Sequence, residues 1–149
     1  MTLAERMLRD LRSTFDGNAW HGTPVRRLLD GIDDAHANAH PIDGARSIAE
    51  LLAHLSAWFD FVDRRLRDEL FEVTPEEDFP HVDSVAFSDL IAQLERRQAV
   101  LCETVQRMDD AEFDRKVPDG RYTKDFMLRG LIHHTTYHAA QIAMLKKFG

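Results

Sequence analysis

The chain has 149 residues, of which 44% are hydrophobic and 30% are charged, and its formal net charge is −7. This length and composition predict one globular domain spanning residues 1–149. The acidic balance argues against a nucleic-acid surface, which needs a basic stripe, and no apolar run is long enough to span a membrane. Cys102 is the only cysteine, and the charged, amphipathic N-terminus is unlike a secretory signal, so we expect a reducing, cytoplasmic location.

Two helical segments are predicted in the first third of the chain. Thr2 and Glu5 form a capping box in front of an apolar stripe. A second segment over residues 23–32 begins with a threonine N-cap and a proline at the first helical position. The two segments are interpreted as one broken helix. Residues 36–46 contain proline and glycine and are predicted to form a loop.

Three longer helices are predicted in the rest of the chain. Ser47 and Glu50 form a capping box at the start of a helix that ends near Leu70. The next helix covers residues 87–108. The last one covers residues 123–147, with a threonine at its N-cap position and two lysines in its last turn.

Four long amphipathic helices, without any segment that alternates like a strand, predict an all-α fold and a four-helix bundle. The connection at residues 71–86 has no strong pattern and is longer than adjacent antiparallel helices require. A connection of this length can cross the end of the bundle and leave the second and third long helices parallel.

Histidines interrupt the core-facing stripe of the last predicted helix. The residues on this face recur at spacings of three and four and are Leu131, His134, His138, Ile142 and Leu145. Burying an imidazole ring without a polar partner costs free energy. A metal ion supplies such a partner, and two histidines at i and i+4 can direct both rings at one ion.

His54, beside the core stripe of another long helix, is the candidate third ligand. The alternative for His54 is a core histidine that is hydrogen-bonded to a protein group. Three imidazoles leave one position open for water or substrate, which is typical of a catalytic metal site. Imidazole ligands suit Zn, Ni, Co or Fe. His133 lies well around the helix from His138 and is expected at the surface.

Gln141 and Tyr137 are the candidate catalytic residues. Gln141 follows His138 by three positions and can hydrogen-bond a ligand or a bound molecule; the alternative is a polar residue at the edge of the bundle. Tyr137 can cover the site or act only as a packing aromatic. His21 is a candidate fourth ligand, whereas Cys102 is expected to be a small buried hydrophobe.

The segments around these histidines resemble the DinB/YfiT-like family. Its hallmark is a histidine in the second long helix, then histidine, tyrosine-histidine and glutamine-isoleucine in the last helix. The matching segments here are GARSIAELLAHLSAWFDFVDRRL and LRGLIHHTTYHAAQIAMLKK. The segment WHGTPVRRLLDGI, residues 20–32, is also similar to the family's first-helix region.

The resemblance implies an up-down-down-up four-helix bundle and a homodimer. It also implies a divalent metal, usually zinc or nickel, on His54, His134 and His138. Branches with known activities resemble thiol-dependent enzymes, namely bacillithiol S-transferases and, more distantly, the mycothiol-dependent maleylpyruvate isomerase. Isomerase-like relatives use a glutamate among the ligands, where this chain has His134.

Two functions are therefore expected from different classes. The first is a metal-dependent enzyme that activates a small thiol for transfer, or activates water for hydrolysis. The second is a non-catalytic, stress-related binding protein that a metal stabilises. The expected partners are a small-molecule substrate, with a low-molecular-weight thiol as cosubstrate, and a second copy of the chain, rather than nucleic acid or a membrane.

Overall fold

The computed structural model describes all residues from Met1 to Gly149, and it is all-α, as the sequence predicts. Its only extended pairing is an isolated β-bridge between Lys116 and Thr123. The long helices are α1 (Leu3–Asp16), α4 (Ile48–Leu66), α6 (Phe87–Arg107) and α8 (Lys124–Leu145). The short ones are α2 (Val25–Leu28), α3 (Asp34–Asn38), α5 (Pro75–Asp78), α7 (Asp110–Phe113) and the 3-10 turn η1 (Lys146–Phe148). No helix combines the length and the apolarity needed to cross a membrane.

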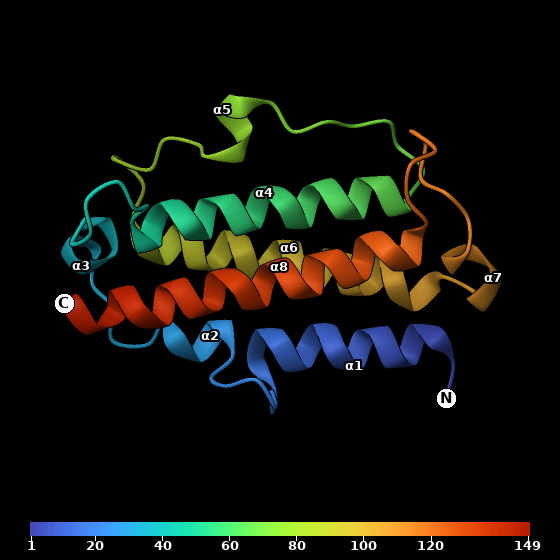
Figure 1. Cartoon of the computed structure of the whole chain (residues 1–149), viewed down its shortest axis with the longest axis horizontal. Helices are drawn as coiled ribbons and strands as arrows, with labels where there is room; N and C mark the ends of the chain where they lie inside the picture. The colour runs from blue at the N-terminus through green and yellow to red at the C-terminus, as the bar shows by residue number, and fades with distance from the viewer.

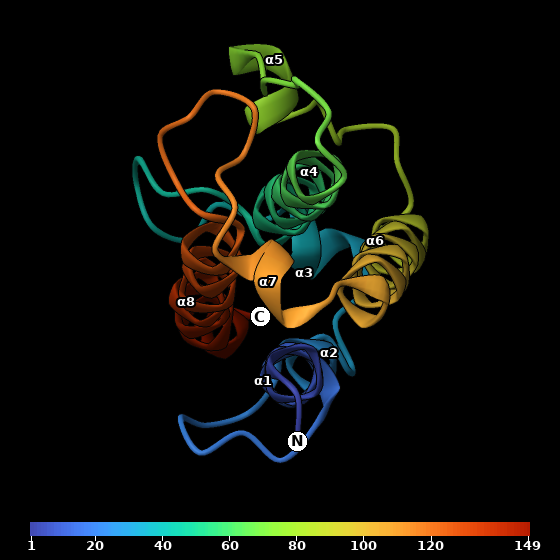
Figure 2. The same cartoon turned by 90° about the vertical axis from the view of Figure 1, so that its right-hand side faces the viewer.

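The four long helices surround one hydrophobic core. Seen along their axes in Figure 2, α4 lies opposite α1, while α6 and α8 occupy the two sides between them. The main contacts follow this arrangement, because α4 and α1 each pack against both α6 and α8. A single cluster of 32 buried hydrophobic residues draws members from all four long helices, so the core is continuous.

The segment between α4 and α6 lies over the outer face of α4. Figure 1 shows the chain leaving the end of α4, running back along the length of that helix through α5, and entering α6 near the end where α4 began. The α4 and α8 helices pack side by side beneath this segment. Residues of α5 are therefore held close to the groove where α4 meets α8.

The predicted helix starts are confirmed by their capping hydrogen bonds. A side-chain hydroxyl accepts from the backbone N–H three residues later at each of three long helices, at a distance of 3.1 Å: Thr2 in α1, Ser47 in α4 and Thr123 in α8. Each such bond satisfies one of the backbone donors that a helix start leaves free. The register of α4 and α8, which carry the histidines, is thus fixed locally.

Several predicted boundaries were wrong. The segment over residues 23–32 is helical only in α2, with Pro24 at the N-cap, because the chain turns afterwards and Gly31 adopts a φ of +77°. The predicted loop over residues 36–46 overlaps α3, which begins because the Asp33 carboxylate accepts from the backbone N–H of His36 at 2.8 Å.

The helix predicted to end near Leu70 ends at Leu66. The side chain of Lys124 is fully buried, and its Nζ donates to the backbone oxygen of Leu66 at 2.6 Å. Asp68 adopts a left-handed φ of 63° and lies 3.0 Å from the same ammonium group. The ammonium group of Lys124, at the start of α8, therefore satisfies one of the backbone oxygens that the end of α4 leaves without a helical partner.

Candidate metal centre

The α4 and α8 helices bring together the three histidines selected from the sequence as metal ligands. The Nε2 atom of His134 lies 3.0 Å from Nε2 of His54 and 3.0 Å from Nε2 of His138. All three candidate ligand atoms lie within 4.8 Å of one another. His134 and His138 are one helical turn apart on α8, and His54 faces them from α4, so the rings meet at one point.

The three rings are held by aromatic packing in the groove between the helices. His54 is 6% exposed and His138 is 7% exposed, while His134 is half-buried. The ring of His54 stacks on Phe79 with centroids 4.2 Å apart and planes 8° apart. The Trp58 ring lies 5.6 Å from the ring of His134. Because these neighbours restrict rotation, the rings are preorganised before any ion binds.

Hydrogen bonds fix the protonated nitrogen of two of the rings. Nδ1 of His54 donates to the backbone oxygen of Asp78 at 2.8 Å, and Nδ1 of His138 donates to Oε1 of Gln141 at 2.6 Å. Both partners are acceptors, so each neutral ring carries its proton on Nδ1. The Nε2 lone pairs of His54 and His138 are consequently directed at the shared point, which is the arrangement that a metal-binding histidine needs.

The residues present fit a divalent cation. Nε2 of His134 carries at most one proton, so it can donate to only one of the two Nε2 lone pairs that face it, those of His54 and His138. A cation between the rings would instead accept the lone pairs of all three Nε2 atoms. Tetrahedral Zn²⁺ with bonds of about 2.0–2.1 Å separates its ligand nitrogens by about 3.3 Å. The two observed 3.0 Å separations, His134 to His54 and His134 to His138, need to widen by only a few tenths of an ångström, and the ligand atoms of His54 and His138 lie within 4.8 Å of each other.

Burial keeps the imidazoles in the form that binds metal. The pKa of His134 is lowered to about 4, mainly by burial and further by the neighbouring His138 and His54. The pKa of His138 is also lowered by burial, although its hydrogen bond to Gln141 opposes this shift. Both rings are therefore neutral at neutral pH, with their lone pairs free for a cation.

Asp78, the last residue of α5, is the functional residue that the sequence did not reveal. Its backbone oxygen bonds His54, and its carboxylate Oδ1 lies 3.0 Å from the same Nδ1. The same Oδ1 accepts from the indole Nε1 of Trp58 at 2.8 Å. The one available signal was the capping box of Thr74 and Glu77 that forms α5, but nothing in the sequence indicated that this turn reaches α4.

The remaining candidates take different positions. Gln141 contacts His138 directly, and Tyr137 is 63% exposed with its ring 5.1 Å from the ring of His138. His21 and His133 are both exposed, and neither belongs to the histidine group. The buried Cys102 lies on α6 and lines a separate hollow that contains no histidine, as the sequence interpretation expected.

Two hollows flank the histidines. One, of about 530 Å³, lies between α4 and α8 and is lined by His134 and Trp58, among others. The other, of about 430 Å³, is lined by His138, Tyr137 and Gln141. The group is thus reachable from two sides.

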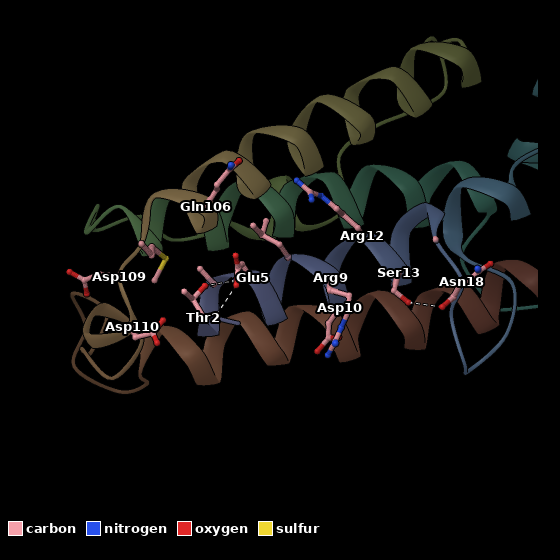
Figure 3. Close-up of a pocket in the computed structure, with 14 residues that line it drawn as sticks. Thr2, Glu5, Arg9, Asp10, Arg12, Ser13, Asn18, Gln106, Asp109 and Asp110 are labelled. Atoms are coloured by element: carbon pink, nitrogen blue, oxygen red, sulfur yellow. Dashed lines mark hydrogen bonds and ion pairs between the residues drawn. The ribbon is translucent and has the colours of Figure 1, made fainter.

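A larger hollow than these two, of about 1140 Å³, lies elsewhere. It follows α1 and the end of α6, and no histidine lines it. Figure 3 shows its polar side chains spread along α1, with Thr2 and Glu5 at one end and Ser13 and Asn18 at the other. Thr2 and Glu5 are engaged in the α1 capping box, and Ser13 donates to the backbone oxygen of Asn18. These groups form helix-end contacts rather than a convergent site.

The family model of the DinB superfamily matches residues 19–142. The chain belongs to the DinB superfamily. The matched range includes α4 and α8 up to Ile142, with all three histidines, whereas α1 lies outside it. Searches of the curated proteins and of the solved structures found no match.

The metal-free DinB protein is expected to lose stability as the pH falls below about 6.5. The unfolded chain takes up a proton at His134 near the ordinary pKa of 6.5, whereas the folded chain does so only near 4. Between these values the unfolded state binds more protons, so the free energy of unfolding decreases as the pH is lowered. Urea unfolding of chelator-treated protein at several pH values measures this slope.

Replacing His134 with Gln should flatten the slope over this pH range. Replacing the exposed His133 with Gln should leave it as in the wild type. Equal slopes in the His134 variant and the wild type would show that His134 is not the buried group responsible.

Proposed function

We propose that this DinB protein is a divalent-metal-dependent enzyme that activates a small thiol, as S-transferases do, or water, as hydrolases do. The observation that carries the proposal is the convergence of three imidazole Nε2 atoms beside hollows large enough for a small molecule. We propose Zn or Ni as the ion, since both accept three imidazoles with a further position open. We also propose that the long helices form the up-down-down-up bundle, which the return of the chain along α4 supports.

The chain's own residues prepare the site by holding protons in place and by positioning a substrate. A divalent ion held by His54, His134 and His138 would lower the pKa of a thiol or of a water molecule and so would supply a nucleophile near neutral pH. Asp78 and Gln141 keep the protons of His54 and His138 on Nδ1, away from the ion position. Tyr137 lies at the rim of the hollow beside His138, where it can position a substrate.

No protein thiol lies at this centre. The only cysteine, Cys102, is buried on α6 in a hollow apart from the histidines, and burial raises the pKa of its thiol. A thiol nucleophile at the histidines must therefore come from a bound small molecule. This requirement favours a thiol cosubstrate or water over a covalent enzyme intermediate.

Metal content and transfer activity test the proposal together. Replacing His54, His134 or His138 with Ala is expected to abolish stoichiometric metal binding in protein purified without a histidine tag, because each removes one of three ligands. Thiol transfer to an electrophile such as a chlorodinitrobenzene should be lost in parallel. Replacing the exposed His133 with Ala is the matched control and should retain both.

Undiminished metal in the three variants would refute the ligand assignment. The alternative function, a non-catalytic binding protein stabilised by the metal, predicts a different result. Chelation would then lower the melting temperature, while no thiol-transfer or hydrolytic activity would appear with or without metal.

We also propose that the protein forms a homodimer through α8. Residues 130–145 contain no Asp, Glu, Lys or Arg. The outward side of this stretch exposes four residues at helical spacing: His133, Tyr137, Ala140 and Met144. An antiparallel pairing of two α8 helices would cover this face in both subunits.

Replacing Ala140 with Glu should convert the dimer into a monomer, because it inserts two like charges close to the two-fold axis. Light scattering coupled to gel filtration measures the molar mass. Replacing the exposed Ala111 of α7 with Glu is the matched control and should leave the mass unchanged. A dimer that persists in the Ala140 variant would contradict this interface.

A further inference from the structure

The hollow between α4 and α8 combines apolar walls with a buried cation at the end away from the histidines. Its volume is about 530 Å³, and eight of its fourteen lining residues are hydrophobic. His134 lies at one end. Arg65, on α4, also lines the hollow and is only 2% exposed. A buried guanidinium in an apolar groove is costly unless its donors are satisfied.

The guanidinium of Arg65 is only partly satisfied within the protein. Its Nε donates to the backbone oxygen of Phe71 at 2.7 Å. Its Nη1 is buried and has no hydrogen-bond partner, although Oδ2 of Asp119 lies 3.2 Å away. The two groups are thus close enough for charge attraction but are not aligned for a hydrogen bond. A planar carboxylate in better alignment would gain two N–H donors at once.

The carboxylate beside Arg65, that of Asp119, is only partly buried. It lies in the turn before α8, where Gly120 adopts a φ of +71°, and its side chain is 27% exposed. Its other oxygen, Oδ1, accepts from the backbone N–H of Arg121 at 2.9 Å. The other charged residues that line the hollow, Arg121 and Glu72, are exposed and carry opposite charges.

The walls suit an extended apolar molecule. Trp58, Phe61 and Val62 line the hollow from α4, and Met127 and Leu131 line it from α8. The rings of Tyr122 and Phe126 stack at the exposed side with centroids 4.8 Å apart. Trp58, whose ring faces His134, and Arg65 are two helical turns apart, which is about 10 Å along the axis of α4.

We propose that this hollow binds a mainly apolar small molecule bearing a carboxylate, which pairs with Arg65 in place of Asp119 while the opposite end reaches His134. The inference rests on the proposed function, because the end at His134 is the one that reacts at the metal. In this proposal, Arg65 binds the carboxylate of the substrate. Asp119 occupies the carboxylate position beside Arg65 when substrate is absent.

A series of ω-mercaptoalkanoates tests the inference on cobalt-loaded protein. Mercaptopropionate, mercaptooctanoate and mercaptoundecanoate are compared by calorimetry with the neutral mercaptoalkanols of the same length, and cobalt absorption reports thiol binding. A chain that spans from the metal to Arg65 should bind about tenfold or more tightly as the carboxylate than as the alcohol. The shortest pair should bind alike, since its carboxylate cannot reach Arg65.

Three variants distinguish a ligand-binding role of Arg65 from a purely structural ion pair with Asp119. Replacing Arg65 with Gln should remove the preference for the long carboxylate, whereas replacing Arg64 with Gln, a neighbour outside the hollow, should keep it. Replacing Asp119 with Asn should strengthen carboxylate binding, because the competing internal charge is gone. A purely structural ion pair predicts no gain in the Asp119 variant, and that variant keeps the test decisive if the Arg65 variant does not fold.

The two proposals fail in different ways. If the carboxylate and alcohol thiols bind the cobalt equally well at every chain length, the role of Arg65 is overturned, whereas the metal centre is supported. Octanoate and octanol are compared on the metal-free protein as a second measurement. A preference for octanoate that is lost in the Arg65 variant supports the carboxylate site even if no thiol binds the metal, whereas equal binding overturns it.

Discussion

The candidate site depends on two hydrogen bonds made behind the imidazoles. His54 and His138 each donate from Nδ1 to a fixed oxygen, provided by Asp78 and Gln141 respectively. These bonds turn both Nε2 lone pairs toward the ring of His134. Without them, the rings could adopt the other tautomer and satisfy one another, and the convergence would no longer favour a cation.

The fold supplies each of these partners from a different part of the chain. Gln141 lies on the same helix as His138, one turn away, so local helical geometry is enough. Asp78 reaches His54 only because the segment after α4 runs back along that helix and forms α5 above it. The same segment provides Phe79, which stacks on His54. The long connection thus completes the candidate metal centre and is more than a link between helices.

The features that could be predicted from the sequence are those set by residues close together along the chain. Hydroxyl caps marked the starts of α1, α4 and α8, and the spacing of His134 and His138 on a core stripe indicated their shared face. The sequence could not show that Asp78 bonds His54, because 24 residues separate them and the intervening segment has no periodicity.

Two further features depended on long-range contacts in the same way. The end of α4 at Leu66 is set by Lys124, 58 residues away. The burial of Arg65 could not be predicted, because in the sequence it is an ordinary helical arginine. Only the folded structure shows that it is buried and lines the hollow, at the end away from His134.

X-ray absorption at the zinc edge of the zinc-loaded, untagged protein tests the central claim most directly. The account predicts three imidazole nitrogens at about 2.0–2.1 Å, with the outer-shell scattering of imidazole rings, and one further light ligand. A first shell made of oxygen atoms without imidazole scattering, or one with fewer than three imidazoles, would contradict it.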